Sequence, residues 1–394
     1  MEFNLKRYEL QDVIKLKYGK NQKKVEDKNG DFPILGTGGV MGYAKEFLYD
    51  KPSVLIGRKG SINKVKYIDK PFWTVDTLFY SEINEEKVVP LYLYYYLSQI
   101  DFDYYNEGTT IPSLRTETLN RIEIFLPDLQ IQKRIVSIIS KFDNKLKINE
   151  SIISNLEQLS QTLFKQWFID FEFPNEEGQP YKSSGGEMVE SELGEIPEGW
   201  TVKYLSENVN FLSGGTPKTK EESYWNGTIP FFTPKDAKNN LYTTTTEKSI
   251  TDLGLEKCNS KLYPKNTLFI TARGTVGKLA LANRPMAMNQ SCFALKHKED
   301  KQFYLYNVVE NLVKEIILGA NGAVFNAINL NDLKRLKYVY SNERLITNFE
   351  NTVSRFYEKM SLLEEENINL QKLRDTLLPK LLSGEIEIPD DLEV

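Results

Sequence analysis

Apolar residues recur at alternating intervals of four and three along residues 128–168. This spacing is typical of a helix whose narrow apolar seam packs against another helix in a coiled coil. Only Asn149 and Ser160 interrupt the seam, so the pattern predicts one long helix with a seam of about 48 Å. The predicted seam residues are Ile135, Ile139, Phe142, Leu146, Ile153, Leu156, Leu163 and Trp167.

The same pattern returns later in the chain at a constant offset that sets Phe349 against Ile135, with Asn367 and Arg374 as its polar interruptions. Two copies of one seam can bury their apolar side chains against each other, so we expect the two helices to pair. The alternative is that each helix packs only on its own globular neighbour, which would better suit a broader apolar face. The second seam consists of Phe349, Val353, Phe356, Met360, Leu363, Leu370, Leu377 and Leu381.

Shorter patterns before each long helix are typical of mixed, strand-rich domains. A short helix is expected from Pro90, a favourable first helical position. Asp128 is placed to cap the first long helix, and Gly384 is placed to end the second. The expected strands are residues 53–56, 63–68, 72–75, 202–205, 229–232, 268–271 and 291–295.

Residues 171–199 are rich in Glu, Gly, Pro and Ser, a composition typical of a linker rather than a domain. The sequence therefore predicts an α+β protein in which two similar mixed α/β domains are joined by two long helices. Its expected segments are a first domain (1–127), a first helix (128–170), an acidic linker (171–199), a second domain (200–341), a second helix (342–384) and an acidic tail (385–394).

The repeat extends into the loops of the two domains. At the offset that relates the two seams, RKGSINK (58–64) aligns with ARGTVGK (272–278). GTTIPSLRTETLNRI (108–122) likewise aligns with GAVFNAINLNDLKRL (322–336). A unit of one domain and one helix has therefore been duplicated.

Duplication restricts how the helices can pair. Each domain precedes its own helix, so an antiparallel coiled coil would carry the domains at opposite ends, as a pseudo-twofold dumbbell. A parallel pair would carry both domains at one end, and a linker of this length would permit that arrangement. We expect the antiparallel pair, because the chain leaving the first helix can then build the second domain where it already lies.

Composition limits the class of protein. With 394 residues, 40% hydrophobic and 27% charged, the chain can form two or three domains with their own cores. Its two cysteines, Cys258 and Cys292, argue against a disulfide framework. There is no run of 18 apolar residues and no apolar signal segment at the start. We therefore expect a soluble, cytoplasmic protein with no membrane partner.

The net charge of −5 is unevenly distributed. Residues 171–199 hold eight acidic residues and one basic residue, and residues 385–394 hold five acidic residues and no basic one. Residues 1–70 hold fifteen Lys or Arg against nine Asp or Glu. The positive charge thus lies in the globular parts, as in proteins that bind nucleic acid, although ordinary solvated surfaces also carry such stretches.

Residues suited to catalysis are scarce. His297 is the only histidine, which leaves no multi-histidine metal site, and its KHK setting predicts a surface position. GTVGKL (274–279) lacks the spacing and the hydroxyl group of a phosphate-binding loop. No glycine-rich nucleotide motif joins a strand to a helix, and no Asn or Asp precedes Pro-Pro and an aromatic residue, as in amino-methyltransferases. We expect no enzymatic activity, metal or cofactor in this chain itself.

Three longer motifs accompany the two helices and the acidic segment: FKQWFIDFEFP (164–174), GEIPEGW (194–200) and LLPKLLSGEIEIP (377–389). Together they resemble the DNA-specificity (S) subunit of type I restriction-modification systems, over essentially the whole chain. The resemblance implies two target recognition domains that each read one half of a bipartite DNA site. It also implies that the paired helices set the distance between the half-sites and dock two methyltransferase (M) subunits. Those subunits bring S-adenosylmethionine, and restriction (R) subunits join the complex for cleavage.

Contacts to double-stranded DNA are expected from the repeated glycine-containing loops and from polar residues near them. Arg and Lys bind guanine, Asn and Gln bind adenine, and Lys, Arg, Ser and Thr hold phosphates. The candidates in the first domain are Lys20, Arg58, Lys59, Ser61, Lys64, Thr109, Thr110 and Arg115. Those in the second domain are Thr216, Lys218, Lys235, Arg273, Thr275, Lys278, Asn289, Gln290 and Asn321.

Two other functions are also compatible with the residues when the family resemblance is left aside. A coiled-coil scaffold that spaces two adaptor domains without binding DNA is slightly favoured by the acidic total. A stand-alone methyltransferase is disfavoured by the missing cofactor motif. DNA binding that requires a methyltransferase partner and falls steeply with salt would distinguish a specificity subunit from both.

Overall fold

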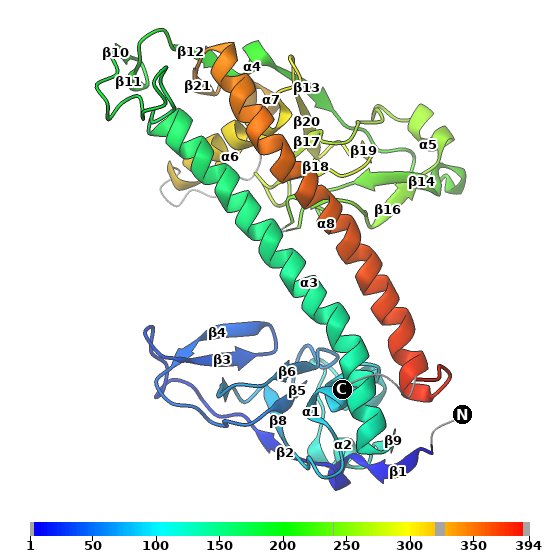
Figure 1. The fold of residues 1–394 in the computed structure, drawn as a ribbon. Helices are drawn as coiled ribbons and strands as arrows, with labels where there is room; N and C mark the ends of the chain where they lie inside the picture. Colours follow the sequence, from blue (N-terminus) through cyan, green and yellow to red (C-terminus); the bar gives the residue numbers. More distant parts are fainter. Residues whose placement is uncertain (1–3, 239, 320–327, 389–394) are drawn as a thin grey trace. The chain divides into compact units, whose positions relative to one another are not determined.

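The computed structural model describes residues 4–238, 240–319 and 328–388. The chain divides into two compact units, unit 1 with residues 1–146 and 369–394 and unit 2 with residues 147–368. Two long helices, α3 (Leu129–Phe164) and α8 (Glu343–Ser383), contribute residues to both units (Figure 1). Within the described ranges, no helix is both long enough and apolar enough to cross a membrane.

Unit 1 contains a four-stranded sheet, a three-stranded sheet and a two-stranded ribbon. Its strands are β1 (Lys6–Glu9), β2 (Ile14–Tyr18), β3 (Phe32–Gly36), β4 (Gly39–Ala44), β5 (Ser53–Gly57), β6 (Lys66–Ile68), β7 (Trp73–Thr74), β8 (Leu78–Ile83) and β9 (Glu123–Leu126). Its short helices are α1 (Pro90–Leu97) and α2 (Thr116–Asn120), with 3-10 turns at Leu10–Asp12 and Phe102–Tyr105. The strand orders are β2-β8-β5-β6, β4-β3-β7 and β1-β9, and among these strands only β3 and β7 pair in parallel.

Strand β5 is the centre of unit 1, and every one of its residues is buried. Helix α1 begins at Pro90, and the preceding Val89 N–H donates to Oε1 of Gln132 on α3 over 2.8 Å. Ile135 and Ile139 of α3 are fully buried in the same core. The first domain is therefore fixed to the long helix both by a hydrogen bond at the start of α1 and by apolar contacts.

Unit 2 repeats this plan with additional strands. Its strands are β10 (Met188–Ser191), β11 (Gly194–Pro197), β12 (Thr201–Tyr204), β13 (Val209–Ser213), β14 (Trp225–Phe232), β15 (Tyr242–Thr243), β16 (Lys248–Ile250), β17 (Leu268–Thr271), β18 (Leu279–Ala282), β19 (Ala287–Met288), β20 (Cys292–His297) and β21 (Lys337–Tyr340). Its helices are α4 (Leu205–Asn208), α5 (Asp252–Glu256), α6 (Gln302–Gly319) and α7 (Leu330–Lys334), with a π-helical turn at Lys165–Ile169 and a 3-10 turn at Glu222–Tyr224.

The sheets of unit 2 have the orders β13-β20-β17-β18-β15, β16-β14-β19, β12-β21 and β10-β11. In sequence, β8 and β20, α2 and α7, and β9 and β21 are each separated by the offset that relates the two seams. The parallel pair β14–β19 repeats the parallel pair β3–β7. The duplication inferred from the loops therefore extends to the strand order of the two domains.

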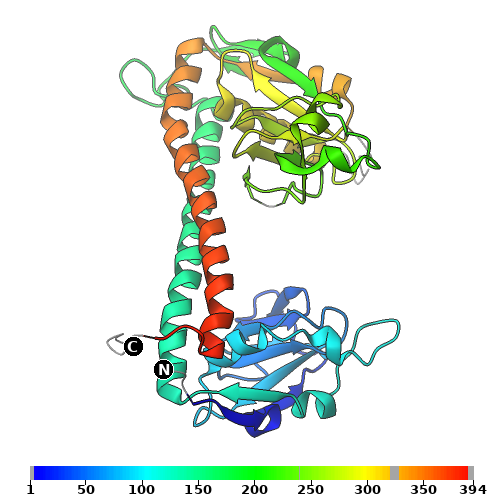
Figure 2. The ribbon, with the colours of Figure 1, turned by 90° about the vertical axis from the view of Figure 1, so that its right-hand side faces the viewer.

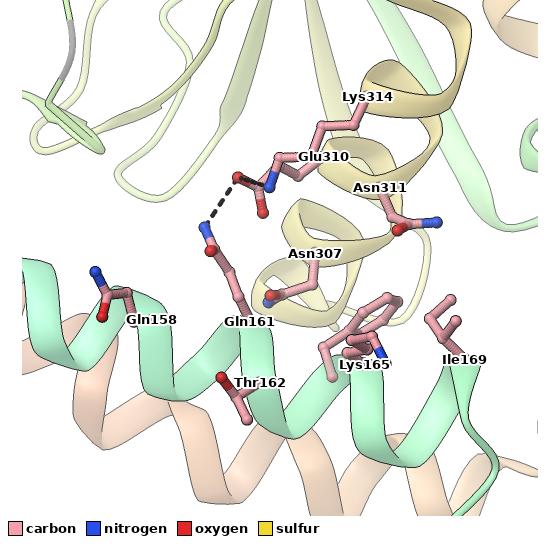
Figure 3. A pocket seen from close by; sticks show the side chains of 10 residues that line it. Gln158, Gln161, Thr162, Lys165, Ile169, Asn307, Glu310, Asn311 and Lys314 are labelled. Carbon is pink, nitrogen blue, oxygen red and sulfur yellow. Dashed lines mark hydrogen bonds and ion pairs between the residues drawn. The ribbon is translucent and has the colours of Figure 1, made fainter. Parts of the chain in front are cut away.

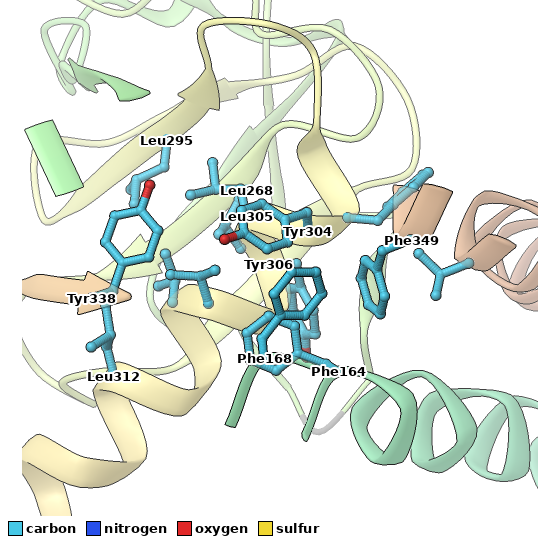
Figure 4. Close-up of a cluster of buried hydrophobic side chains, with 14 of the residues drawn as sticks. Phe164, Phe168, Leu268, Leu295, Tyr304, Leu305, Tyr306, Leu312, Tyr338 and Phe349 are labelled. Atoms are coloured by element: carbon cyan, nitrogen blue, oxygen red, sulfur yellow. The ribbon is translucent and has the colours of Figure 1, made fainter. Parts of the chain in front are cut away.

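Aromatic rings fill the part of the unit 2 core that surrounds the end of α3 (Figure 4). The ring of Phe168 lies 5.0 Å from Tyr304 on α6 and 5.3 Å from Phe349 on α8. Glu350 of α8 accepts hydrogen bonds from the N–H groups of Phe303 (3.1 Å) and Tyr304 (2.8 Å), at the start of α6. A side chain of a long helix thus caps a domain helix in unit 2 as Gln132 does in unit 1.

The long-helix segments contact each other within each unit. In unit 1, Arg374 of α8 pairs with Asp143 of α3 over 2.8 Å. In unit 2, α8 lies beside α3 in both views (Figures 1 and 2), and the partner numbers fall as the α3 numbers rise. The segments therefore run in opposite directions within unit 2. The contacts there include Asn149 with Asn367 (2.8 Å), Ser160 with Tyr357 (3.3 Å) and Phe168 with Phe349 (5.3 Å between ring centres).

The linker expected over residues 171–199 is instead a folded part of unit 2. Strands β10 and β11 form an antiparallel hairpin. Phe173 is buried, and its ring stacks on Tyr181 (4.6 Å) and on Trp200 (5.0 Å). The expectation rested on average composition, which gave too little weight to Phe171 and Phe173 at the start of the segment. Burying those rings attaches the acidic segment to the core.

His297 lies in the core, and its predicted surface position is wrong. It is the last residue of β20 and is 2% exposed, because the alternation of the strand turns it inward between two exposed lysines. Its Nδ1 accepts a hydrogen bond from the Glu299 N–H over 3.1 Å. Burial lowers the pKa of His297 to about 4, so the ring is neutral near pH 7.

Candidate nucleic-acid interface

The candidate loops of unit 1 meet at residues 73–77, which comprise β7 and the three residues after it. Backbone hydrogen bonds attach three different loops to this short segment, so it is the common support of the site. The bonds are Lys20 N to Thr74 O (2.8 Å), Val75 N to Leu35 O (3.1 Å) and Arg58 N to Thr77 O (2.8 Å).

Unit 2 repeats this support at residues 287–291. The equivalent backbone bonds are Gly215 N to Met288 O (3.0 Å), Asn289 N to Phe232 O (2.9 Å) and Ala272 N to Ser291 O (2.8 Å). The two supporting segments are again related by the offset of the sequence repeat. Side chains carried by these loops are therefore presented in equivalent positions in the two domains.

A second pair of loops is attached to the first in each unit. In unit 1, Leu114 N donates to Arg58 O over 2.9 Å, and in unit 2, Ile328 N donates to Ala272 O over 3.0 Å. Gly60 and Gly274 both have φ of +84°, a conformation that favours glycine and explains why this residue recurs in the two loops. The structure therefore brings the two aligned loop motifs of unit 1 side by side.

Most candidates of unit 1 present exposed side chains around this support. Arg58 is half-buried: its Nη1 donates to Asp76 O over 2.9 Å and its guanidinium lies 5.1 Å from the Tyr18 ring. Arg115 pairs with Glu107 over 3.0 Å. The remaining candidates, all exposed, are Lys20, Lys59, Ser61, Lys64, Thr109 and Thr110.

In unit 2, three of the candidates line one hollow of about 350 Å³, namely Lys235, Arg273 and Asn289. Lys235 is also 3.8 Å from Glu247, which lines the same hollow. Thr233, Lys248 and Ser291 line it as well, and sequence reasoning missed them. Ser291 could have been found, because in the sequence repeat it takes the position that Thr77 has in the support of unit 1.

The other described candidates of unit 2 do not line this hollow. Thr216 is hydrogen-bonded to Gln290, and the Lys218 carbonyl accepts from Trp225 Nε1 over 3.2 Å. Thr275 and Lys278 are exposed in the glycine-containing loop. Asn321 lies outside the described residues.

The chemistry of the hollow suits a nucleic acid. Lys and Arg side chains can hold phosphates or read guanine, and an asparagine can bind adenine through two hydrogen bonds. Glu247 can accept a hydrogen bond from the amino group of cytosine. Basic groups, an amide and hydroxyl groups thus converge on one concave surface, without a dedicated metal site: the described ranges contain no group of three His, Cys, Asp or Glu residues placed to hold an ion.

A larger hollow of about 390 Å³ lies between the end of α3 and α6 (Figure 3). Its chemistry is mainly amide, and Gln161 Nε2 donates to Glu310 Oε1 over 2.9 Å. Lys314 pairs with the same Glu310 oxygen over 2.9 Å. None of the DNA-contact candidates lines this hollow.

All of the predicted seam residues are buried or half-buried. The buried ones are Ile135, Ile139, Leu146, Ile153, Phe349, Val353, Met360, Leu363 and Leu381. The half-buried ones are Phe142, Leu156, Leu163, Trp167, Phe356, Leu370 and Leu377. Sequence reasoning missed Phe164, Phe168 and Tyr357, which are buried at the unit 2 end of the pair.

Two separate stretches of the chain, residues 4–158 and 197–338, match the family described as the type I restriction modification DNA specificity domain. Because they cover more than half of the chain, the chain belongs to this family. The resemblance drawn from the motifs is therefore confirmed, and the reading as a scaffold without a role in DNA specificity is set aside.

Among its relatives is the type I restriction enzyme MjaIX specificity subunit of Methanocaldococcus jannaschii. The two are 27% identical over 354 residues, which span 87% of this chain and 79% of that protein. The HindI specificity subunit of Haemophilus influenzae is 23% identical over 364 residues, spanning 77% and 79%. The crystal structure of a type I restriction-modification S subunit from M. genitalium matches with a TM-score of 0.64 at 19% identity, over 99% of this chain and 97% of that one. That match supports the mixed α/β fold with its long helices.

Proposed function

We propose that this chain is the DNA-binding specificity subunit of a type I restriction-modification enzyme, with each domain reading one half of a bipartite site. The observation that carries the proposal is the repeated support, residues 73–77 in unit 1 and 287–291 in unit 2. Each support holds basic loops through the same three backbone hydrogen bonds. Two equivalent readers in one chain fit a DNA site made of two parts.

The different side chains on the two supports favour two different half-sites. A buried valine, Val75, stands in unit 1 where the partly exposed Asn289 stands in unit 2, and Lys59 stands where Arg273 stands. An equivalent backbone with changed side chains keeps the docking geometry and alters which base edges can be contacted. A palindromic site would not require this difference.

For the whole chain, we propose a pseudo-twofold dumbbell in which α3 and α8 pair as an antiparallel coiled coil and set the spacing of the half-sites. Contacts between the two helices within each unit favour this arrangement. The segments run in opposite directions in unit 2, and each polar seam residue named from the sequence has a polar partner on the other helix. The domain boundaries given from the sequence belong to this proposal, except that residues 171–199 form a folded part of unit 2 and not a linker.

We propose that the chain is not catalytic and that S-adenosylmethionine and the methyl-transfer residues belong to partner methyltransferase subunits. Restriction subunits would join the same complex, which we expect in the cytoplasm. The only histidine of the chain is a neutral core residue, which argues against a histidine-based active site here.

The direct test is binding of double-stranded DNA by the chain together with its methyltransferase partner. Specific binding should require the partner and should weaken steeply as salt rises from 50 to about 200 mM, because phosphate contacts release counterions. A protein that binds the partner but retains no preference for any duplex would contradict the proposal and favour the scaffold.

The partner stoichiometry is a second test. The acidic segments and the helix ends recur with the duplication, so we propose two equivalent docking surfaces and one copy of this chain with two methyltransferase subunits. The mass of the complex at saturating partner should correspond to one chain and two partners. A saturated one-to-one complex would contradict equivalent docking.

A further inference from the structure

The start of β4, directly after the turn from β3, presents two apolar side chains to solvent. Val40 is 58% exposed and Met41 is 59% exposed, in a unit whose other large apolar residues are mostly buried. Met41 is the extra residue of a β-bulge, because Leu35 pairs with Val40 and Ile34 pairs with Gly42. A bulge often redirects a side chain beside a functional site.

The turn is held firmly in place. The Lys66 ammonium group donates to the carbonyl oxygens of Gly36 and Thr37, both over 2.8 Å. A Cβ atom on Gly36 would lie 2.4 Å from Met41 Sδ and 3.8 Å from Val75 Cγ2. The Met41 thioether therefore lies against Gly36, close to Val75 of the support.

The strand that leads into this turn is hydrogen-bonded to the segment that holds the candidate DNA loops of unit 1. Val75 belongs to the 73–77 support, and its N–H donates to Leu35 O at the base of the turn. Lys20 and Arg58 are attached to the same support. An apolar projection that is flanked by basic loops suits contact with base edges in a DNA groove better than contact with an apolar protein surface.

The equivalent surface of unit 2 has a different chemistry. The parallel pairing sets Leu35 opposite Thr74 in unit 1 and Phe232 opposite Met288 in unit 2. The residues after Phe232 are Thr233, Pro234 and Lys235, which line the basic hollow together with Asn289. After the equivalent residue of unit 1, Leu35, the chain instead has Gly36, Thr37 and Gly38, and the exposed Val40 and Met41 follow them.

We propose that Val40 and Met41 are specificity-determining residues that read a thymine of the first half-site through its C5-methyl group. The methyl group is the only apolar feature on the major-groove edge of a base pair, so exposed apolar side chains can select it. The inference rests on the proposed function and assigns a chemical preference to one of its two readers.

The test uses the complex of the full chain with its methyltransferase partner and a duplex that carries the methylated site. Each thymine of the first half-site is replaced by uracil in turn, which removes only the methyl group. One replacement should weaken binding about fourfold, the value of one buried methyl group. In the variant Val40→Ser/Met41→Ser, the thymine and uracil duplexes should bind equally.

The matched control is Leu373→Ser, which removes an exposed leucine from α8. This variant should keep the wild-type ratio of thymine to uracil binding. A second control replaces thymines of the second half-site by uracil. There, the wild type and the Val40→Ser/Met41→Ser variant should have the same ratio of thymine to uracil binding.

Two results would overturn the inference. Wild-type binding could be unaffected by uracil at every thymine of the first half-site, or the double variant could keep the full discrimination. Either result would leave the proposed function standing if the duplex is still bound specifically. A complex that binds no duplex specifically would instead contradict the proposed function.

Discussion

Asn149 and Asn367 form a polar contact inside an apolar seam of unit 2. Asn149 Nδ2 donates to Asn367 Oδ1 and to Glu366 Oε2, both over 2.8 Å, and both asparagines are buried. A buried polar pair contributes less stability than apolar packing, but it selects one register, because any shift would leave each amide without its partner. The pair is therefore suited to fix how the two helix segments align.

The change Asn149→Leu should lower the free energy of unfolding by about 1–3 kcal/mol, because Asn367 Oδ1 would lose its hydrogen bond in the core. Adding Asn367→Leu should recover most of the loss. Urea unfolding of the full chain measures both effects. Asn155→Ala, an exposed position on the same helix, is the control, and an equal loss there would show that the seam pair has no special role.

Glu350 of α8 is a buried carboxylate that accepts hydrogen bonds from the start of α6. Burial raises its pKa above the ordinary 4.5, although the hydrogen bonds from the Tyr304 and Phe303 N–H groups oppose the shift. A raised pKa in the folded state means that its contribution to stability is fully present below about pH 4.5 and is lost as pH rises through the raised value. The folded state is therefore less stable with Glu350 ionised, near neutral pH, than with Glu350 protonated.

The change Glu350→Gln keeps an acceptor for the α6 cap but cannot ionise. As the pH is lowered from 7 to 5, we expect the wild type to gain stability relative to this variant. Thermal unfolding at the two pH values measures the difference. Glu358→Gln, an exposed position on α8, is the control. If Glu350→Gln showed the same dependence on pH as the wild type, the folded-state pKa of Glu350 would not be raised.

Among the elements, the long helices were the most predictable. The seam spacing and Asp128 placed α3 close to its observed start at Leu129, and the Asp128 carboxylate accepts from Ile131 N over 3.0 Å as a cap. The strand expected over residues 268–271 matches β17. Such elements are set by local spacing and capping, which one sequence displays directly.

The features that could not be predicted from the sequence depend on tertiary packing. The seam spacing marked Leu163 and Trp167 at the end of α3, but the π-helical turn at Lys165–Ile169 brings Phe164 and Phe168 into the core. The sequence repeat identified the loops of the candidate site, but not how these loops come together in one surface. The support at residues 73–77 is held by backbone hydrogen bonds between distant segments, which spacing cannot reveal.

The difference in burial between Phe168 and Trp167 can be tested by measuring the stability of two variants. Phe168→Ala should cost about 3–5 kcal/mol, because the ring is 3% exposed and touches rings of α6 and α8. Trp167→Ala should cost less, because that side chain is only half-buried. Denaturant unfolding compares the two variants, and a larger loss for Trp167→Ala would mean that the seam continues to the helix end.

For the whole molecule, the proposed role of the paired helices is that of a ruler. Half-sites read from one face of B-DNA should have centres about one turn apart, or 34–36 Å. Because Asn149 faces Asn367, Ser151 faces a point near Glu365. Inserting four residues after each of these two positions should lengthen the pair by about 6 Å, close to two base pairs.

Methylome sequencing of a host that expresses this insertion variant with its methyltransferase partner measures the spacer. The spacer should grow by one or two base pairs while both half-site sequences stay the same. An insertion in α3 alone is the control, and it should disturb the pairing and reduce methylation. An active double-insertion variant with an unchanged spacer would mean that the helices do not set the distance.

The central claim is that the two domains read separate half-sites independently. Residues 1–127 can be exchanged for the equivalent domain of another specificity subunit, and the methylated sequence can be determined in a host that carries the methyltransferase partner. We predict that one half of the site changes while the other half stays intact, and that the reciprocal exchange of residues 200–341 changes only the other half. A change in both halves after either exchange would contradict the account.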